Sequence, residues 1–210
     1  MALSQYALTT LQTIKDELGI TDTSLDGFLE RKINSMSEAI EKYCGRYFAK
    51  RTVTVKLPAP SGLDLILPDY PITTVSEVKL DGTAITDYEV YGDTGQLWRE
   101  TGWSTEYYRR GIAQDLVLST EKIIEVTYTT GYVTETQATA NNPRTLPYEL
   151  ENYCIDAVKV EYYKKDVDPN IEQESLLSSS VKYDRKVSGQ LGLPPTVING
   201  LQQNGWVKHS

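Results

Sequence analysis

The stretch from residue 25 to residue 44 constrains the fold of this chain more than any other. It reads LDGFLERKINSMSEAIEKYC and is followed by Gly45. At about 100° per residue, its apolar side chains fall in one stripe and nearly all its charged side chains fall opposite. The spacing predicts an amphipathic helix of about six turns, roughly 30 Å long. We expect Thr23 to cap its start and Gly45 to end it in a left-handed conformation.

Two further segments have the helical spacing needed to cover this apolar stripe. Residues 8–18 repeat leucine and isoleucine at helical intervals and end at Gly19. Residues 146–164 form a wide apolar face that begins beside Pro147, a residue suited to a first helical turn. The short loop between the first two segments predicts that those helices pack together. The third segment is the natural partner of the long one.

Between the second and third helices the pattern alternates with a period of two, which is typical of strands. Alternating runs occupy residues 51–57, 63–67, 71–80 and 124–128, and Asp81-Gly82 is a strong signal for a type I′ hairpin turn. The sequence therefore predicts the α+β class: a small bundle of three main helices, an antiparallel β insertion and an extended C-terminal arm. The expected domains are 1–48 with 133–165 (bundle), 49–132 (insertion) and 166–210 (arm).

The arm has two possible interpretations. Residues 166–190 are polar and rich in serine, and Pro194-Pro195 then starts a short apolar helix with Trp206 beyond it. An apolar knob on a polar tether favours docking onto another subunit or protein. The alternative is that the knob folds back onto the core of its own chain.

Charge and composition exclude several classes of function. The 210-residue chain has a net charge of −8, and an acidic protein does not neutralise phosphates well enough to hold nucleic acid tightly. The charge suits a channel through which a polyanion slides without sticking, or it merely keeps the protein soluble. We expect no membrane span and no signal peptide, because no apolar run reaches the required length. Cys44 and Cys154 are expected to be small buried hydrophobes.

The sequence offers little for catalysis. Its only histidine is His209, next to the last residue, and it has no Walker-type loop and no GxSxG motif. The acidic stretch from Asp166 to Glu174 resembles a calcium loop, but Ile171 stands where the turn glycine belongs and Leu177 replaces the bidentate glutamate. We therefore expect no enzyme activity, no cofactor and no metal.

Aromatic residues gather in the β insertion together with two arginines. Tyrosine, tryptophan and arginine are enriched at subunit interfaces, and aromatic rings also stack on sugars or bases. A third possibility is that large side chains complete a small β core. The residues concerned are Tyr88, Tyr91, Trp98, Trp103, Tyr107, Tyr108, Arg109 and Arg110.

The order of several motifs resembles the head–tail connector (adaptor) proteins of tailed phages. The motifs are AIEKYCGRYF at 39–48, LPDYPI at 67–72 followed by Asp81-Gly82, VTYTTGY at 126–132, Leu146-Pro147, and LPP at 193–195. The resemblance covers roughly residues 8–98, 123–164 and 191–203, whereas residues 99–122 match no motif of that family.

This resemblance implies a structural protein of the virion neck, made in the host cytoplasm. It implies a dodecameric ring that docks under the portal, lengthens the DNA channel without binding DNA tightly, and receives a stopper or tail-completion protein. The portal-docking arm would use Val197, Ile198, Leu201 and Trp206. Subunit-interface candidates are Tyr88, Tyr91, Trp98, Trp103, Tyr107 and Arg109, and channel-facing candidates are Glu30, Glu38 and Glu41.

Two other functions are compatible with the sequence. One is a different neck or tail-completion protein, although a small β-barrel stopper would lack the long amphipathic helices. The other is a carbohydrate-binding module built on Trp98 and Trp103.

Overall fold

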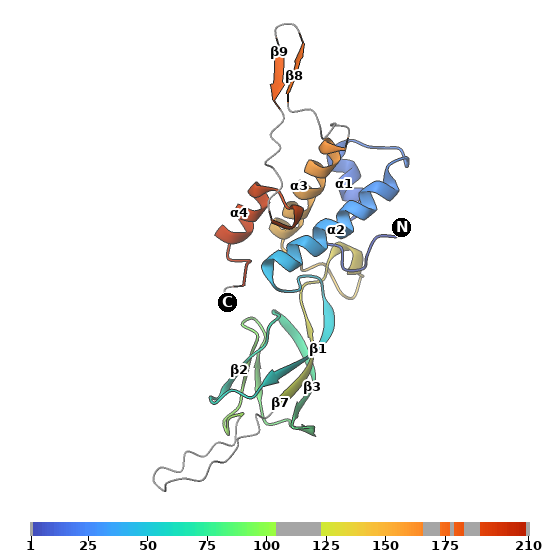
Figure 1. Cartoon of the computed structure of the whole chain (residues 1–210). Coiled ribbons are helices and arrows are strands. Elements are labelled where there is room, and N and C mark those ends of the chain that lie inside the picture. Colours follow the sequence, from blue (N-terminus) through green and yellow to red (C-terminus); the bar gives the residue numbers. More distant parts are fainter. Residues whose placement is uncertain (1, 104–122, 166–172, 177–178, 183–189, 209–210) are drawn as a thin grey trace. The chain divides into compact units, whose positions relative to one another are not determined.

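A computed structural model describes residues 2–103, 123–165, 173–176, 179–182 and 190–208. The chain divides into two compact units (Figure 1). The helical unit comprises Met1–Ala49 and Tyr132–Ser210, and the β unit comprises Lys50–Gly131. Four α-helices and antiparallel sheets confirm the predicted α+β class.

The helical unit contains α1 (Leu11–Leu18), α2 (Asp26–Cys44), α3 (Tyr148–Lys164) and α4 (Pro195–Gln203). Two short 3-10 helices, η1 (Glu135–Gln137) and η3 (Gln190–Gly192), lie between these elements in the sequence. Strands β8 (Gln173–Leu176) and β9 (Ser179–Lys182) pair with each other as an antiparallel hairpin. The described part of the predicted arm therefore contains a hairpin and a helix.

Helix α2 follows the predicted long helix closely but starts differently. Its first residue is Asp26, and Leu25 stands at the N-cap without a side-chain hydrogen bond, so the predicted Thr23 cap is wrong. The backbone carbonyl of Thr23 instead accepts a hydrogen bond from the Asp26 N–H. Gly45 ends the helix in the left-handed conformation, with φ of 69°, as predicted.

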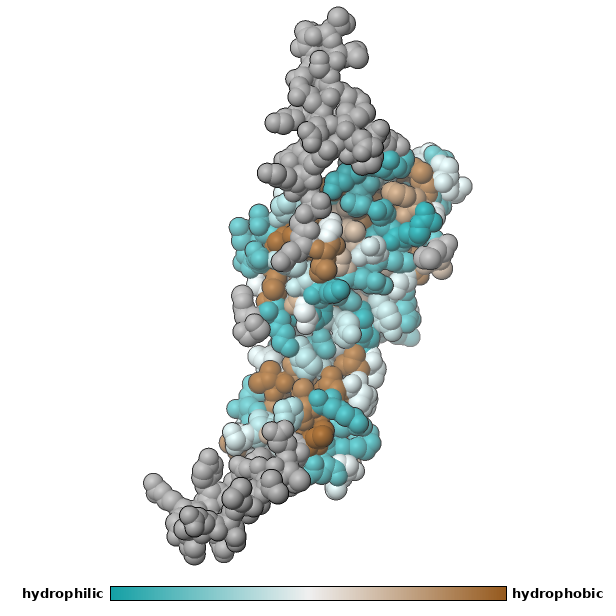
Figure 2. All heavy atoms as spheres, in the orientation of Figure 1, coloured by the Kyte–Doolittle hydropathy of each residue, from teal (hydrophilic) through white to brown (hydrophobic). Residues whose placement is uncertain are grey.

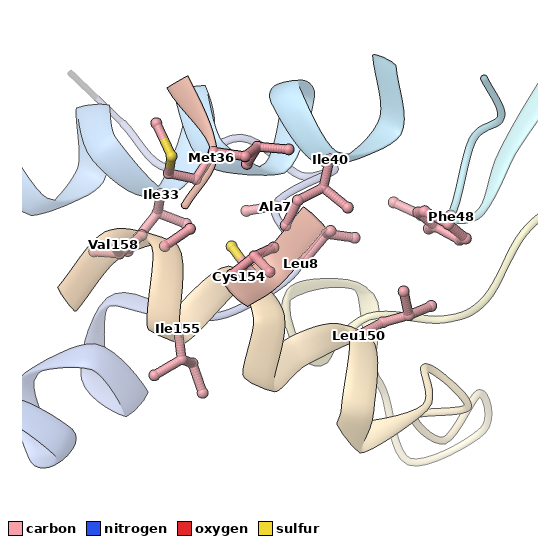
Figure 3. Packing of buried hydrophobic residues seen from close by; sticks show 14 of the residues in the cluster. Ala7, Leu8, Ile33, Met36, Ile40, Phe48, Leu150, Cys154, Ile155 and Val158 are labelled. Atoms are coloured by element: carbon pink, nitrogen blue, oxygen red, sulfur yellow. The ribbon is translucent and has the colours of Figure 1, made fainter. Parts of the chain in front are cut away.

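The core of the helical unit forms where α2 and α3 pack together (Figure 3). Residues 7–8, which precede α1, add two buried side chains to the same cluster, and α1 itself begins only at Leu11, where Thr10 caps it. Both cysteines are free and buried in this core, which confirms their interpretation as small hydrophobes. Buried side chains in the contact include Leu8, Ile33, Met36, Ile40, Leu150, Cys154, Ile155 and Val158.

The β unit is a small sandwich of two antiparallel sheets. The larger sheet has the order β1-β7-β3-β4, with β1 (Arg51–Pro58), β3 (Ile72–Leu80), β4 (Thr83–Ala84) and β7 (Ile123–Thr130). The smaller sheet has the order β2-β6-β5, with β2 (Asp64–Ile66), β5 (Glu89–Tyr91) and β6 (Gln96–Trp98). Alternate side chains of both sheets form one buried cluster.

The predicted hairpin turn at Asp81-Gly82 connects β3 to β4. Both residues have positive φ, 49° for Asp81 and 81° for Gly82, which the type I′ turn requires. The local turn signal was therefore sufficient to place this corner of the larger sheet.

We expect Ile33→Ala to lower the free energy of unfolding by about 2–5 kcal/mol, because it opens a cavity between α2 and α3. The matched control is Ser35→Ala on the exposed side of the same helix, which should change the stability by less than about 0.5 kcal/mol. Urea unfolding followed by helical circular dichroism measures both. Equal stability of the two variants would contradict this account of the core.

Candidate functional site

The outer face of the smaller sheet presents a group of aromatic and acidic side chains. In its register, Asp64 lies opposite Trp98 and Trp98 opposite Glu89, while Gln96 lies between Ile66 and Tyr91. Leu65 and Leu97 point into the sandwich, so these six neighbours point outward. We call them the acidic aromatic face: Asp64, Ile66, Glu89, Tyr91, Gln96 and Trp98.

This face exposes large apolar side chains beside two carboxylates. Ile66 is 62% exposed and Tyr91 is 48% exposed, and the space-filling view shows apolar residues at the surface of the β unit (Figure 2). The Gln96 amide donates to Asp64 at 2.7 Å, and the Tyr91 hydroxyl donates to Glu89 at 3.1 Å. The hydrogen bond to the Glu89 carboxylate raises the pKa of Tyr91. The face therefore combines contact area with fixed negative charge.

The six predicted interface residues divide into three groups. Tyr91 and Trp98 lie on the acidic aromatic face. Trp103 is fully buried and its indole N–H donates to the Leu63 carbonyl at 2.8 Å, so its prediction as an interface residue is wrong. Tyr88 is half-buried against the same core, with its ring 6.5 Å from that of Trp103. Tyr107 and Arg109 lie outside the described residues.

The C-terminal segment folds back onto the helical unit. Val197 and Leu201 of α4 are 1% and 0% exposed and belong to the same core as α2 and α3. Gly200 lets the helix approach closely, because a Cβ atom at this position would lie 2.5 Å from the Tyr153 ring of α3. Ile198 is partly buried against the same core. Of the two interpretations of this segment, the described structure shows the intramolecular one.

Trp206 fixes the chain beyond α4. Its indole N–H donates to Glu149 at 3.2 Å, and its ring meets Phe48 edge-on at 5.9 Å. The Arg46 guanidinium lies over both rings, 4.9 Å from the Phe48 centroid and 5.4 Å from that of Trp206. Asn204 also donates to Glu149, and the Lys208 N–H donates to the Cys44 carbonyl at 2.9 Å. The end of the described chain is thus attached to both α2 and α3.

This packing corrects the predicted portal-docking residues. Val197 and Leu201 have no surface to offer while α4 lies in the core, and Ile198 and Trp206 offer only part of theirs. The physical reason is that the apolar face of α4 is buried against its own bundle. Among residues 191–208, whose side chains the structure describes, the only large apolar side chain that is well exposed is Leu191, at 45%.

The three predicted channel-facing residues differ in their exposure to solvent. Glu41 is buried, and its carboxylate accepts the backbone N–H groups of Phe48 and Ala49 at 2.8 and 3.1 Å, so it does not face a channel. Glu38 is exposed and Glu30 half-exposed. The exposed stripe of α2 consists of Arg31, Ser35, Glu38 and Lys42, which carries more positive than negative charge. This helix alone does not form an acidic wall.

The comparisons with known proteins identify the family. A family model described as "head completion protein" matches residues 7–202. The chain belongs to the head completion protein family. This confirms the predicted resemblance to phage head–tail connectors. The comparison with curated protein sequences gave no match.

Solved structures share the fold of this head completion protein. One chain, from "Neck of empty GTA particle computed with C6 symmetry", has 16% identity and a TM-score of 0.59, with 100% of this chain and 94% of that chain covered. A second, from "Virion of native gene transfer agent (GTA) particle", has 17% identity and a TM-score of 0.57 over 100% and 94%. A third, from "Neck of native GTA particle computed with C12 symmetry", has 16% identity and a TM-score of 0.53 over 100% and 93%.

The described residues of this head completion protein show no arrangement for metal chemistry. Among them, no cluster of three or more histidine, cysteine, aspartate or glutamate side chains could hold a metal ion. None of the helices in that part of the chain has the length and hydropathy of a membrane span. His209 and most of the acidic stretch that resembles a calcium loop lie outside the described residues.

We expect Gly200→Ala to loosen the C-terminal segment, although alanine normally favours a helix. The new methyl group would collide with the Tyr153 ring and separate α4 from α3. Hydrogen exchange in residues 193–207 should therefore become faster. The matched control is Gly27→Ala in α2, where nothing lies within 4 Å of the new Cβ atom. Equal protection in both variants would contradict the docked position of α4.

We also expect both thiols to be unreactive in the folded protein. Burial raises the pKa of Cys44 and of Cys154 to about 12, so only about one thiol in ten thousand is a thiolate at pH 8. Ellman's reagent at pH 8 should label neither cysteine until urea unfolds the chain, and should then label both. Rapid labelling without urea would contradict the buried positions.

Proposed function

We propose that this chain is the structural head–tail connector of a tailed phage or phage-like particle. In this proposal, copies form a ring in the virion neck, dock under the portal, extend the DNA channel and provide the platform for a stopper or tail-completion protein. The observation that carries the proposal is the family match, which covers residues 7–202 and so includes both units and α4.

The symmetry of the similar structures supports the ring. Two of them are particle necks computed with C6 or C12 symmetry, and each is covered almost completely by this chain. A cyclic ring needs head-to-tail contacts, in which two different surfaces of one subunit meet. A dodecamer is the simplest assembly compatible with both symmetries, and we propose it for this chain.

The role that we propose is mechanical and not catalytic. Both thiols are buried and have raised pKa values, which is unsuitable for a nucleophile. The burial of Trp103 also removes one of the two tryptophans on which a carbohydrate-binding module would depend. The alternative is another neck protein or tail-completion protein of the virion, because the description "head completion protein" names no neighbouring protein.

The proposed portal contact differs from the one inferred from the sequence. Insertion of Val197 and Leu201 into a portal would first require α4 to leave the core, at a cost of about 1.5–3 kcal/mol for each side chain. We therefore propose that docking uses the exposed surface around Leu191, before α4, while α4 stays in place. In the proposed ring, the helical unit forms the wall, and the C-terminal segment stays packed on that unit.

We expect particles made without this chain to lack one ring layer at the neck and to carry no tail. Electron cryomicroscopy of particles with and without an intact gene for the chain measures this. The missing density should have sixfold or twelvefold symmetry and should return when the gene is supplied separately. Complete, tailed necks in the absence of the chain would refute the proposal.

A further inference from the structure

We propose that the acidic aromatic face of one copy binds the outer edge of β1 in a second copy. This inference deepens the proposed ring by naming the two surfaces that meet, and it rests on that proposed function. Both surfaces belong to the β unit, so the inference does not depend on how the two units of the chain are arranged.

The first surface has the composition of a contact site. Ile66, Tyr91 and Trp98 present apolar area, and large exposed apolar side chains on a folded unit commonly mark a binding surface. Tyrosine and tryptophan are the residues that most often carry binding energy at interfaces. Asp64 and Glu89 flank them, and both are held by hydrogen bonds within the face. The surface therefore favours a partner that is apolar and basic.

The second surface offers both properties. Strand β1 is an edge of the larger sheet and pairs only with β7 among the described strands. Its inward side chains Val53, Val55 and Leu57 are only partly buried, whereas those of β7 are fully buried. The strand begins after Lys50 with Arg51, and Lys56 is well exposed while forming an ion pair with Glu125 of β7 at 3.0 Å.

Natural sheets usually protect such an edge. Bulges, prolines or inward charges prevent a further strand or surface from adding to it. The pairing of β1 with β7 is continuous over eight residues, and its only proline is Pro58, the last residue. Threonine pairs Thr52–Thr129 and Thr54–Thr127, each with its hydroxyl oxygens 3.0 Å apart, hold the strand in register. The outer edge of β1 is therefore ordered, and no further described strand pairs with it.

Geometry excludes a contact between the two surfaces within one copy. The acidic aromatic face points away from the larger sheet, because Leu65 and Leu97 between its residues pack inward toward that sheet. Strand β1 belongs to the larger sheet, so the two surfaces of one copy cannot meet. Between copies they meet head to tail, and such a contact closes into a ring when the rotation allows it. Attraction between the acidic aromatic face and the lysines at the β1 edge then favours this contact and fixes how the two surfaces align.

Charge reversal tests this pairing directly. The face variant is Asp64→Lys/Glu89→Lys, and the edge variant is Lys50→Glu/Lys56→Glu. Each variant alone brings like charges together, so we expect self-association to weaken at least about tenfold. In an equimolar mixture every contact is complementary again if the two variants alternate around the ring. We therefore expect the mixture to recover assembly, measured by native mass spectrometry and sedimentation velocity.

Control variants have the same charge changes on the helical unit. They are Glu38→Lys/Asp156→Lys and Lys42→Glu/Lys164→Glu, all at exposed positions, and they should assemble like the unmodified chain. If a charge reversal lowers the unfolding temperature, a milder neutral variant replaces it: Asp64→Asn/Glu89→Gln for the face or Lys50→Gln/Lys56→Gln for the edge, each with a smaller and salt-dependent loss expected.

The outcomes separate this inference from the proposed function. Assembly of both single variants like the unmodified chain, or a mixture that stays dissociated, would overturn the inference. The same variants are also supplied to particles that lack the gene. A normal ring with each single variant there would overturn the pairing but leave the connector role intact. Absence of the unmodified chain from the neck would instead overturn the proposed function.

Discussion

The apolar stripe of α2 is the constraint on which the rest of the structure depends. Its partners come from distant parts of the sequence, because α3 begins at Tyr148, α4 begins at Pro195, and Leu8 lies near the start of the chain. The whole β unit is inserted between α2 and α3. The core of the helical unit therefore forms only when both ends of the insertion return to one place, which the Tyr132 N–H marks by donating to the Phe48 carbonyl at 2.6 Å.

A buried carboxylate controls how the chain leaves this helix. Glu41 lies one turn before the end of α2 and accepts two backbone N–H groups of residues 48 and 49. Such charge-assisted hydrogen bonds are stronger than neutral ones and compensate for removing the carboxylate from water. The same region holds Arg46 over Phe48 and Trp206. Polar groups here determine the direction in which the chain leaves α2, whereas burial of the apolar stripe of α2 stabilises the helical unit.

The sequence predicted what depends on local pattern and missed what depends on distant partners. The 3.6-residue and two-residue periods located α2, α3, β1, β3 and β7, and the glycine turn placed the β3–β4 corner. Glu41 falls on the polar side of a helical wheel, but a returning chain covers it. Trp103 and Leu201 were predicted to contact partners, and both are instead buried within their own chain. Periodicity cannot reveal whether the cover comes from the same chain or from a partner.

The two units differ in how completely their apolar surfaces are buried within the chain. In the helical unit, the apolar face of α4, for which docking onto a partner was the prediction, is buried against its own bundle. In the β unit, the three-residue strands of the smaller sheet leave Ile66 and Tyr91 substantially exposed on its outer face. A sheet so small cannot bury both sides of its own strands, because its second face has no layer to pack against. In the proposed ring, a neighbouring subunit supplies the layer that this face lacks.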